Sequence, residues 1–226
     1  MLRAVLAFIL IVCPVFAKSG PDINALKKSW GKIDSITIKK FAGNRHAITV
    51  RKGETRALRD LYMIAPENPE LLLWLFHGYK PKGDPYKQSP EVFIKNMGLK
   101  ELSSWYNALV VIIDSGVSLY SYIPDNGLPE IQIYCEVYDR LAKQYGTLPA
   151  VLTGVSSGAE GAVKFAPFVN NLKSLICISG IYNFDSLPAD SNEYRIHLKE
   201  YGSSADWKYE QPVRIFPVLK CRIILL

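Results

Sequence analysis

The sequence predicts an α/β fold, a doubly wound and mostly parallel sheet that begins with antiparallel strands. Five apolar runs lack the in–out alternation of a half-exposed strand, which is typical of strands covered on both faces by helices. A strong helical pattern lies between two of them, and residues 35–64 read instead as short alternating strands. The apolar runs are residues 71–76, 108–113, 150–152, 175–178 and 221–226.

The first 17 residues have the pattern of a secretory signal peptide. Arg3 supplies a positive charge, residues 4–12 form an apolar run, and Val15-Phe16-Ala17 resembles a cleavage site. The run is shorter than the about 20 residues needed to span a bilayer, although a short membrane anchor or a buried helix is the alternative. We therefore expect a secreted or periplasmic protein whose mature chain begins at Lys18.

Residues 18–226 are expected to form one domain that uses no cofactor. The formal net charge of the whole chain is +6, but its basic residues are scattered and not interleaved with aromatic residues, which argues against nucleic-acid binding. No later segment is apolar enough to insert stably into a membrane. Cys135, Cys177 and Cys221 are an odd number, so at least one thiol is free or has an external partner. Three histidines in a spacing unlike that of zinc sites predict no metal site.

The elements follow in order from a polar lead-in at residues 18–34. Residues 35–40 and 47–51 are predicted to form a hairpin around Gly43-Asn44, and residues 55–64 continue it as a third strand. A turn follows at residues 66–69. A helix is predicted over residues 129–145, with Pro129 at its first position and Gly146 at its end.

The sharpest motif is Gly154-Val155-Ser156-Ser157-Gly158. It follows an apolar strand and precedes a helix rich in small residues, which is the context of a nucleophile elbow. Glycines 154 and 158 would let strand and helix approach closely, and the turn would present the Ser156 hydroxyl. The amide of Ser157 would then face a developing oxyanion from a helix N-terminus. The alternative is a glycine-rich turn without chemistry.

A second motif lies at the end of the run at residues 71–76. His77-Gly78-Tyr79 follows it, and Gly78 would allow the backbone to approach a substrate. The segment resembles the His-Gly motif that follows the third strand of α/β-hydrolases, and this resemblance implies that amides of Gly78 and Tyr79 complete the oxyanion hole with that of Ser157. His77 is expected to be structural at the base of the loop, with a general base as the other reading.

These motifs, with Ile178-Ser179-Gly180-Ile181-Tyr182 and residues 206–212, resemble α/β-hydrolase serine esterases of the carboxylesterase and kynurenine-formamidase kind. The resemblance covers about residues 55–226 and implies a cap or pocket insertion at residues 185–217. Prolyl-oligopeptidase-type peptidases and polyester depolymerases share these features. The sequence departs from many relatives at Ala159, where they have a second glycine.

The resemblance implies a secreted hydrolase that cleaves a small carboxylic ester or similar acyl bond through an acyl-serine intermediate on Ser156. In this superfamily the acid and then the histidine follow the serine along the chain. His197 is the only histidine after Ser156. It is therefore the candidate general base, oriented by Asp185 or Asp190, unless it is a surface residue of a cap helix over residues 191–201.

The usual histidine of the last strand has no counterpart here, so the sequence is interpreted as truncated at its C-terminus and poorly active. The alternatives are a prolyl-oligopeptidase-type serine peptidase and a non-catalytic secreted binding protein built on the same scaffold.

Overall fold

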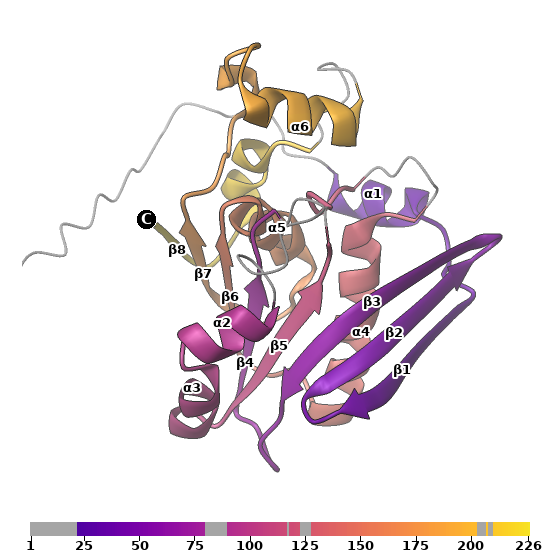
Figure 1. Cartoon of the computed structure of the whole chain (residues 1–226), viewed down its shortest axis with the longest axis vertical. Coiled ribbons are helices and arrows are strands. Elements are labelled where there is room, and N and C mark those ends of the chain that lie inside the picture. Colours follow the sequence, from indigo (N-terminus) through magenta and orange to yellow (C-terminus); the bar gives the residue numbers. More distant parts are fainter. Residues whose placement is uncertain (1–21, 80–89, 117, 123–127, 203–206, 208–209) are drawn as a thin grey trace, which may run out of the picture.

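The computed structural model of the chain contains one eight-stranded sheet with helices on both faces (Figure 1). It describes residues 22–79, 90–116, 118–122, 128–202, 207 and 210–226. The expected signal peptide at residues 1–17 and the expected mature start at Lys18 lie outside these residues.

The sheet has the strand order β1-β2-β3-β5-β4-β6-β7-β8. The strands from β1 to β5 in this order are antiparallel, and those from β5 to β8 are parallel. This arrangement confirms the predicted fold class. The strands are β1 (Ser35–Ala42), β2 (Arg45–Lys52), β3 (Thr55–Ile64), β4 (Leu71–Phe76), β5 (Ala108–Asp114), β6 (Ala150–Val155), β7 (Leu172–Ile178) and β8 (Arg222–Leu225).

Helices cover the two faces unequally. The larger apolar cluster joins the sheet to α4 and α5, whereas a smaller one lies beneath α2 and α3 on the other face. A third small cluster lies beneath α6, above the carboxyl ends of the parallel strands (Figure 1). The helices are α1 (Ile23–Ser29), α2 (Pro90–Asn96), α3 (Leu99–Trp105), α4 (Glu130–Tyr145), α5 (Ser157–Phe165) and α6 (Asn192–Tyr201), with short 3-10 turns η1 (Ala166–Phe168), η2 (Phe184–Ser186), η4 (Pro212–Arg214) and η5 (Phe216–Val218).

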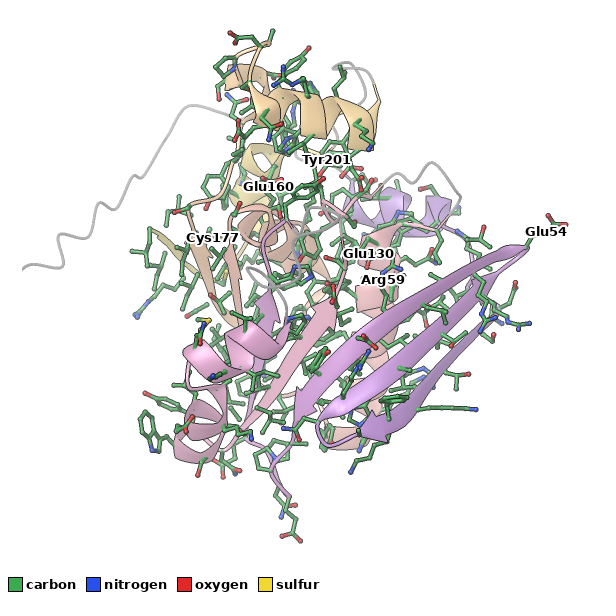
Figure 2. All side chains as sticks on the ribbon, in the orientation of Figure 1. Glu54, Arg59, Glu130, Glu160, Cys177 and Tyr201 are labelled. Atoms are coloured by element: carbon green, nitrogen blue, oxygen red, sulfur yellow. The ribbon has the colours of Figure 1, made fainter. Side chains whose placement is uncertain are left out.

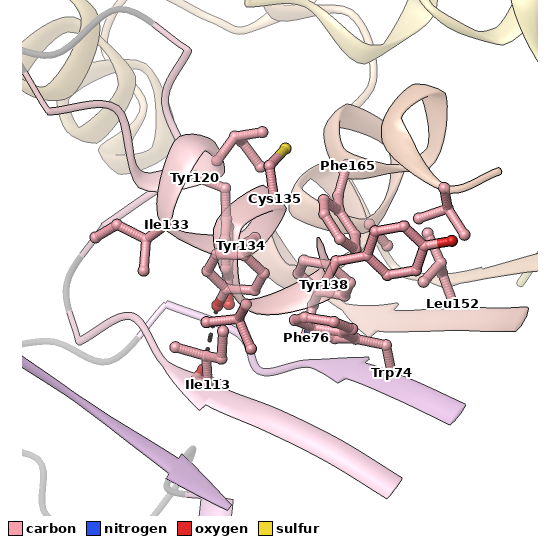
Figure 3. Close-up of a cluster of buried hydrophobic side chains, with 14 of the residues drawn as sticks. Trp74, Phe76, Ile113, Tyr120, Ile133, Tyr134, Cys135, Tyr138, Leu152 and Phe165 are labelled. Atoms are coloured by element: carbon pink, nitrogen blue, oxygen red, sulfur yellow. Dashed lines mark hydrogen bonds between the residues drawn. The ribbon is translucent and has the colours of Figure 1, made fainter. Parts of the chain in front are cut away.

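The centre of the larger cluster is aromatic (Figure 3). Phe76 of β4 stacks on Tyr134 of α4, with 5.2 Å between ring centroids and 14° between ring planes. Phe165 of α5 packs on Trp74 with centroids 4.9 Å apart. The Tyr134 hydroxyl donates a hydrogen bond of 3.2 Å to the carbonyl of Ile113, so its buried polar atom is satisfied. These contacts fix α4 and α5 against the strands that carry the predicted motifs.

Two elements differ from the sequence prediction. The polar lead-in contains α1, and Trp30 just after it is buried and donates a hydrogen bond of 3.0 Å to the carbonyl of Tyr122. Pro129 precedes α4 as its N-cap and is not its first residue. Tertiary packing of Trp30 overrides the polar composition around it. None of the helices in the described ranges is both long and apolar enough to cross a bilayer.

The parallel strands deliver the predicted motifs to one edge of the sheet. His77 follows β4, Ser115 follows β5, Ser156 follows β6 and Ser179 follows β7. In open α/β sheets, the crevice outside the carboxyl ends of the strands is where ligands bind. This edge is therefore the candidate active site.

Candidate active site

Ser156 occupies the sharp turn between β6 and α5. Its backbone has φ 56° and ψ −127°, a combination that L-residues rarely adopt and that costs of the order of 1–3 kcal/mol. The amide of Ser156 donates a 2.8 Å hydrogen bond to the carbonyl of Ile178 on β7. The side chain is exposed, and its hydroxyl forms no hydrogen bond with any described residue. The turn therefore presents a free hydroxyl above the sheet, as the elbow interpretation expects.

The two glycines of the motif are required by close backbone contacts. A Cβ on Gly154 would lie 2.1 Å from the carbonyl oxygen of Gly158. A Cβ on Gly158 would lie 2.2 Å from the carbonyl oxygen of Phe76 and 2.5 Å from that of His77. Such distances are far inside van der Waals contact, so any side chain would push α5 away from β6 and from the end of β4. Because Gly154 and Gly158 have no side chains, α5 packs directly against β6 and the end of β4. Ser157 therefore lies next to the His77-Gly78-Tyr79 segment.

Ser157 is the first residue of α5, and its amide therefore has no acceptor within the helix. The same helix end carries partial positive charge, which favours an anion. Its side chain is buried, and the hydroxyl has no hydrogen-bond partner among the described residues. Ser157 thus provides a donor of the kind that an oxyanion hole needs.

His77 is held as a neutral ring at the base of the predicted oxyanion loop. The amide of Ser115 donates to Nε2 at 3.0 Å, so Nε2 is an acceptor and the proton resides on Nδ1. Nδ1 then donates to the carbonyl of Gly78 at 2.7 Å. The ring is 1% exposed, and Asp114 Oδ1 lies 3.5 Å from Nε2. Both ring nitrogens therefore bond to backbone groups, one in the loop and one at Ser115 just after β5. His77 thus holds the loop in place against the end of β5.

Tyr120 supports the same loop from below. Its hydroxyl donates a 2.6 Å hydrogen bond to the carbonyl of His77, and the residue adopts a positive φ of 60°. Its ring fills the space beside Gly161, where a Cβ would lie 2.5 Å from the ring. Burial raises the pKa of Tyr120 well above that of an ordinary tyrosine, so the phenol stays a neutral donor. Tyr120 was not identified from the sequence because only the fold brings it beneath His77.

Solved structures with similar folds include two acetyl xylan esterases and an acylaminoacyl peptidase. Acetyl xylan esterase 1 from Thermoanaerobacterium sp. JW/SL YS485 has a TM-score of 0.54 at 10% identity, over 93% of this chain and 79% of that one. An acetyl xylan esterase from Paenibacillus sp. R4 has a TM-score of 0.52 at 13% identity, over 89% and 75% of the two chains. The fold is that of an α/β-hydrolase.

Acylaminoacyl peptidase from Pyrococcus horikoshii also matches this α/β-hydrolase fold, with a TM-score of 0.56 at 16% identity. The match covers 90% of this chain and 33% of the peptidase, so the chain spans about a third of that protein. No protein-family model and no curated protein sequence matches the chain.

Ala159, where the sequence departs from many α/β-hydrolases, is accommodated by the neighbouring strand end. Its methyl group lies where a Cβ on Gly180 would meet it at 2.7 Å. Ser179, just before that glycine, has a positive φ of 53° and is exposed at the end of β7 beside Ser156. The predicted Ser179-Gly180 segment therefore makes room for the larger residue on α5.

His197 lies in the segment that covers the carboxyl edge of this hydrolase fold. The sequence offered a surface position for it on a cap helix, and this is wrong because the side chain is only 3% exposed. Its Nε2 lies 3.3 Å from Glu160 Oε2, its Nδ1 lies 2.7 Å from the carbonyl of Glu193, and its ring packs on Phe184. Asp185 and Asp190 are exposed and do not contact it. The carboxylate beside His197 therefore comes from α5, one turn after Ser156.

A second buried charge on α5 faces the same segment. Lys164 is fully buried, and its Nζ lies 3.0 Å from Glu210 Oε2 and 2.7 Å from the hydroxyl of Tyr201. Glu210 also accepts hydrogen bonds from the Tyr122 amide at 2.8 Å and from the Ser121 hydroxyl at 2.9 Å. Figure 2 places Glu160 and Tyr201 together between α5 and α6.

This polar network ties α6 and the following turn to the helix of the nucleophile. This network was not predicted from the sequence. The signal for it was the pair Glu160 and Lys164, two charged residues four positions apart in a short helix whose other residues are small or apolar.

The three thiols of the described residues differ in burial. Cys135 and Cys177 are buried, Cys221 is half-buried, and all three are free. Within the described ranges, no three histidine, cysteine, aspartate or glutamate side chains gather as metal ligands.

Proposed function

We propose that this α/β-hydrolase fold carries a secreted serine hydrolase that cleaves a carboxylic ester or related acyl bond. The observation that carries the proposal is the elbow itself. Ser156 has a strained backbone at φ 56°, an exposed hydroxyl and two flanking glycines that allow no side chain. Strain of this kind persists only where the surrounding structure imposes it, and it is concentrated at functional sites.

The proposed reaction follows from these positions. Oγ of Ser156 attacks the acyl carbon, the new Oγ–C bond forms, and the hydroxyl proton passes to a base. The carbonyl oxygen gains negative charge facing the amides of Tyr79 and Ser157, with Gly78 allowing the close approach. The base returns the proton to the leaving alcohol as its bond to the acyl carbon breaks. Water, deprotonated by the same base, then attacks the acyl-serine, which releases the acid, and the base returns the proton to Oγ of Ser156.

Esterase activity is favoured over peptidase activity by the extent of the similarity. The two acetyl xylan esterases are matched over 79% and 75% of their lengths, whereas the acylaminoacyl peptidase is matched over 33%. A small ester, including an acetylated sugar, is therefore the substrate class to test first. Peptide hydrolysis is the runner-up within enzymes, and a non-catalytic binding protein is the alternative outside them.

We also propose that the 226-residue chain turns over its substrate slowly. His46, His77 and His197 each have ring contacts elsewhere, and none of them contacts Ser156. A serine hydroxyl needs a base to become a good nucleophile, and such a base contributes about 10²–10⁴-fold. His197 remains the candidate base, and it would have to leave Glu160 to act directly on Ser156.

The decisive experiment is substitution at the elbow. We expect Ser156→Ala to reduce hydrolysis of p-nitrophenyl acetate to the uncatalysed background and to abolish labelling by a fluorophosphonate probe. The matched control is Ser179→Ala, because Ser179 is also exposed with a positive φ at the end of the next strand. Equal activity in Ser156→Ala and the unsubstituted chain would overturn the assignment.

Two further comparisons test which class of substrate is cleaved and which residue acts as the base. A panel of short acyl esters, acetylated xylo-oligosaccharide and an N-acylated peptide distinguishes esterase from peptidase, and binding without turnover would favour the non-catalytic alternative. His197→Ala should lower the ester rate if His197 is the base, and His46→Ala serves as its control. N-terminal sequencing of secreted product tests export, with Lys18 the expected first residue.

A further inference from the structure

The outer face of β1, β2 and β3 is a second exposed surface, distant from the sheet edge that carries Ser156. The inner face of these strands is apolar and packs on α4, through residues that include Ile48, Val50 and Leu61. The opposite face is exposed, and residues of β1 and β2 line a shallow hollow of about 320 Å³ on it. The lining residues are Ser35, Thr37, Lys39, Ala47, Thr49 and Arg51.

The strand register arranges this face in three rows. The first row runs Ser35–Arg51–Arg56 across the three strands. The second row is Thr37–Thr49–Leu58, and the third is Lys39–Ala47–Asp60. The hollow therefore has the guanidinium of Arg51 at one end, with Arg56 beside it on the next strand, hydroxyls in the middle and the ammonium group of Lys39 at the other end.

The cations of this face, Lys39, Arg51 and Arg56, differ from the other arginines of these strands, Arg45 and Arg59. Arg59, on the inner face, donates to both carboxylate oxygens of Glu130, and Arg45 lies 2.6 Å from Asp60. By contrast, Lys39, Arg51 and Arg56 are exposed and form no ion pair with any described residue. The strands thus pair their other arginines and leave these three cations available.

Two of the three available cations are placed directly against each other. Arg51 and Arg56 are register partners on neighbouring antiparallel strands, so their Cβ atoms are about 5 Å apart. Like charges in this position are destabilising, and Glu54 in the intervening turn forms no ion pair with described residues. A bound carboxylate would relieve the repulsion, because the planar guanidinium matches it with two hydrogen bonds.

We propose that the outer face of β1, β2 and β3 binds an acidic polysaccharide, specifically a polyuronate chain. Carboxylates of the chain pair with Arg51 and Arg56 at one end and with Lys39 at the other. The uncharged middle row suits the sugar hydroxyls, since Thr37 and Thr49 each provide a donor and two acceptors, and Ser35 adds a hydroxyl beside Arg51 in the first row. A densely sulfated or phosphorylated chain would place charge over this middle row, which has no cation to meet it.

Other large anions fit this face less well. A bilayer is bound by continuous apolar surface, whereas this face is hollowed, the hollow is lined mostly by polar residues, and the exposed Leu58 lies in a row with two threonines. Single-stranded nucleic acid is bound by aromatic residues on which the bases stack, and none lines the hollow. Figure 2 places Glu54, at the end of the β2–β3 hairpin, far from Glu160 and Tyr201 near the nucleophile. The proposal is therefore independent of the proposed hydrolase function.

The test measures binding of polygalacturonate to the full chain by isothermal titration calorimetry at low ionic strength. The variant Lys39→Gln/Arg51→Gln/Arg56→Gln removes the three cations and is expected to lose about tenfold or more in affinity. The matched control Lys173→Gln/Lys199→Gln/Lys220→Gln removes the same charge from exposed positions elsewhere and should bind within twofold of the unsubstituted chain. Circular dichroism and thermal unfolding confirm that both variants remain folded.

Three further results decide the proposal. Thr37→Val/Thr49→Val should weaken polygalacturonate binding without changing the charge, which separates a built site from general attraction. Ser156→Ala should bind normally, so failure of the hydrolase assignment would not affect this result. Equal losses in both charge variants, no binding of polygalacturonate, or stronger dependence on the same three residues for heparin, anionic vesicles or single-stranded DNA would overturn it.

Discussion

Lys164 Nζ lies 3.0 Å from Glu210 Oε2, and both side chains are almost completely removed from solvent. The pair joins the helix that follows the nucleophile to the segment that precedes β8. Removing one partner of a buried ion pair leaves an uncompensated charge, which costs far more than the net value of the pair. The contact therefore determines how firmly the covering segment is held.

We expect Glu210→Gln to destabilise the protein strongly, by about 3–5 kcal/mol in urea unfolding, because Lys164 would lose its counter-ion. Lys164→Met should do the same by isolating Glu210. The double variant Lys164→Met/Glu210→Gln should lose less than the sum, since no buried charge remains. If the two single losses add without coupling, the pair does not behave as a buried unit.

Gly158→Ala should destabilise the fold by about 3 kcal/mol or more, because the new Cβ would meet the backbone of Phe76. Thermal unfolding followed by circular dichroism measures the loss. Ala159→Gly is the control one residue further along the same helix. It should cost only about 1 kcal/mol, the ordinary difference in helix propensity. Similar losses in the two variants would contradict the close approach of α5 to β4.

The three described thiols should react unequally with a disulfide reagent in the native protein. Burial raises the pKa of Cys177 to about 12 and raises that of Cys135 still further, so neither forms thiolate near neutral pH. Burial raises the pKa of Cys221 as well, but this thiol is half-buried and remains accessible. Native labelling should therefore be located at Cys221 by mass spectrometry and be lost in Cys221→Ser.

Labelling of Cys135 before unfolding would contradict this prediction. Complete labelling in denaturant serves as the control, since it shows that every thiol is chemically competent.

The stability of the protein should fall as pH rises above about 10. Burial raises the pKa values of Tyr122, Tyr134 and Tyr201 well above 10 in the folded state, whereas in the unfolded chain these phenols ionise near 10. Their contribution is thus complete below pH 10 and is lost as pH rises further, because only the unfolded state releases the protons.

Tyrosinate absorbance reports this ionisation. The absorbance from Tyr122, Tyr134 and Tyr201 should increase together with the loss of circular dichroism, because these buried phenols ionise only on unfolding. Gradual ionisation of all tyrosines in a still-folded protein would contradict the burial of these phenols.

The sequence by itself determined the fold, and it predicted the elbow. Buried parallel strands need uninterrupted apolar residues, so residues 71–76 and their counterparts were recognisable without any partner in view. The Gly154–Gly158 motif was recognisable for a similar reason, because the glycines are imposed by the turn and helix in which they lie. Such local requirements leave a signature in neighbouring residues.

Tertiary structure alone decided which distant side chains meet. Glu160 faces His197, Tyr120 lies beneath His77, and Arg51 lies beside Arg56 across a hairpin whose register fixes the face of each residue. Glu160 and His197 are 37 positions apart, and a single sequence contains no pattern that links two such distant residues, because they come together only when the chain folds. The burial of His197 is the clearest case, because the polarity of α6 indicated solvent whereas Phe184 and Glu160 enclose the ring.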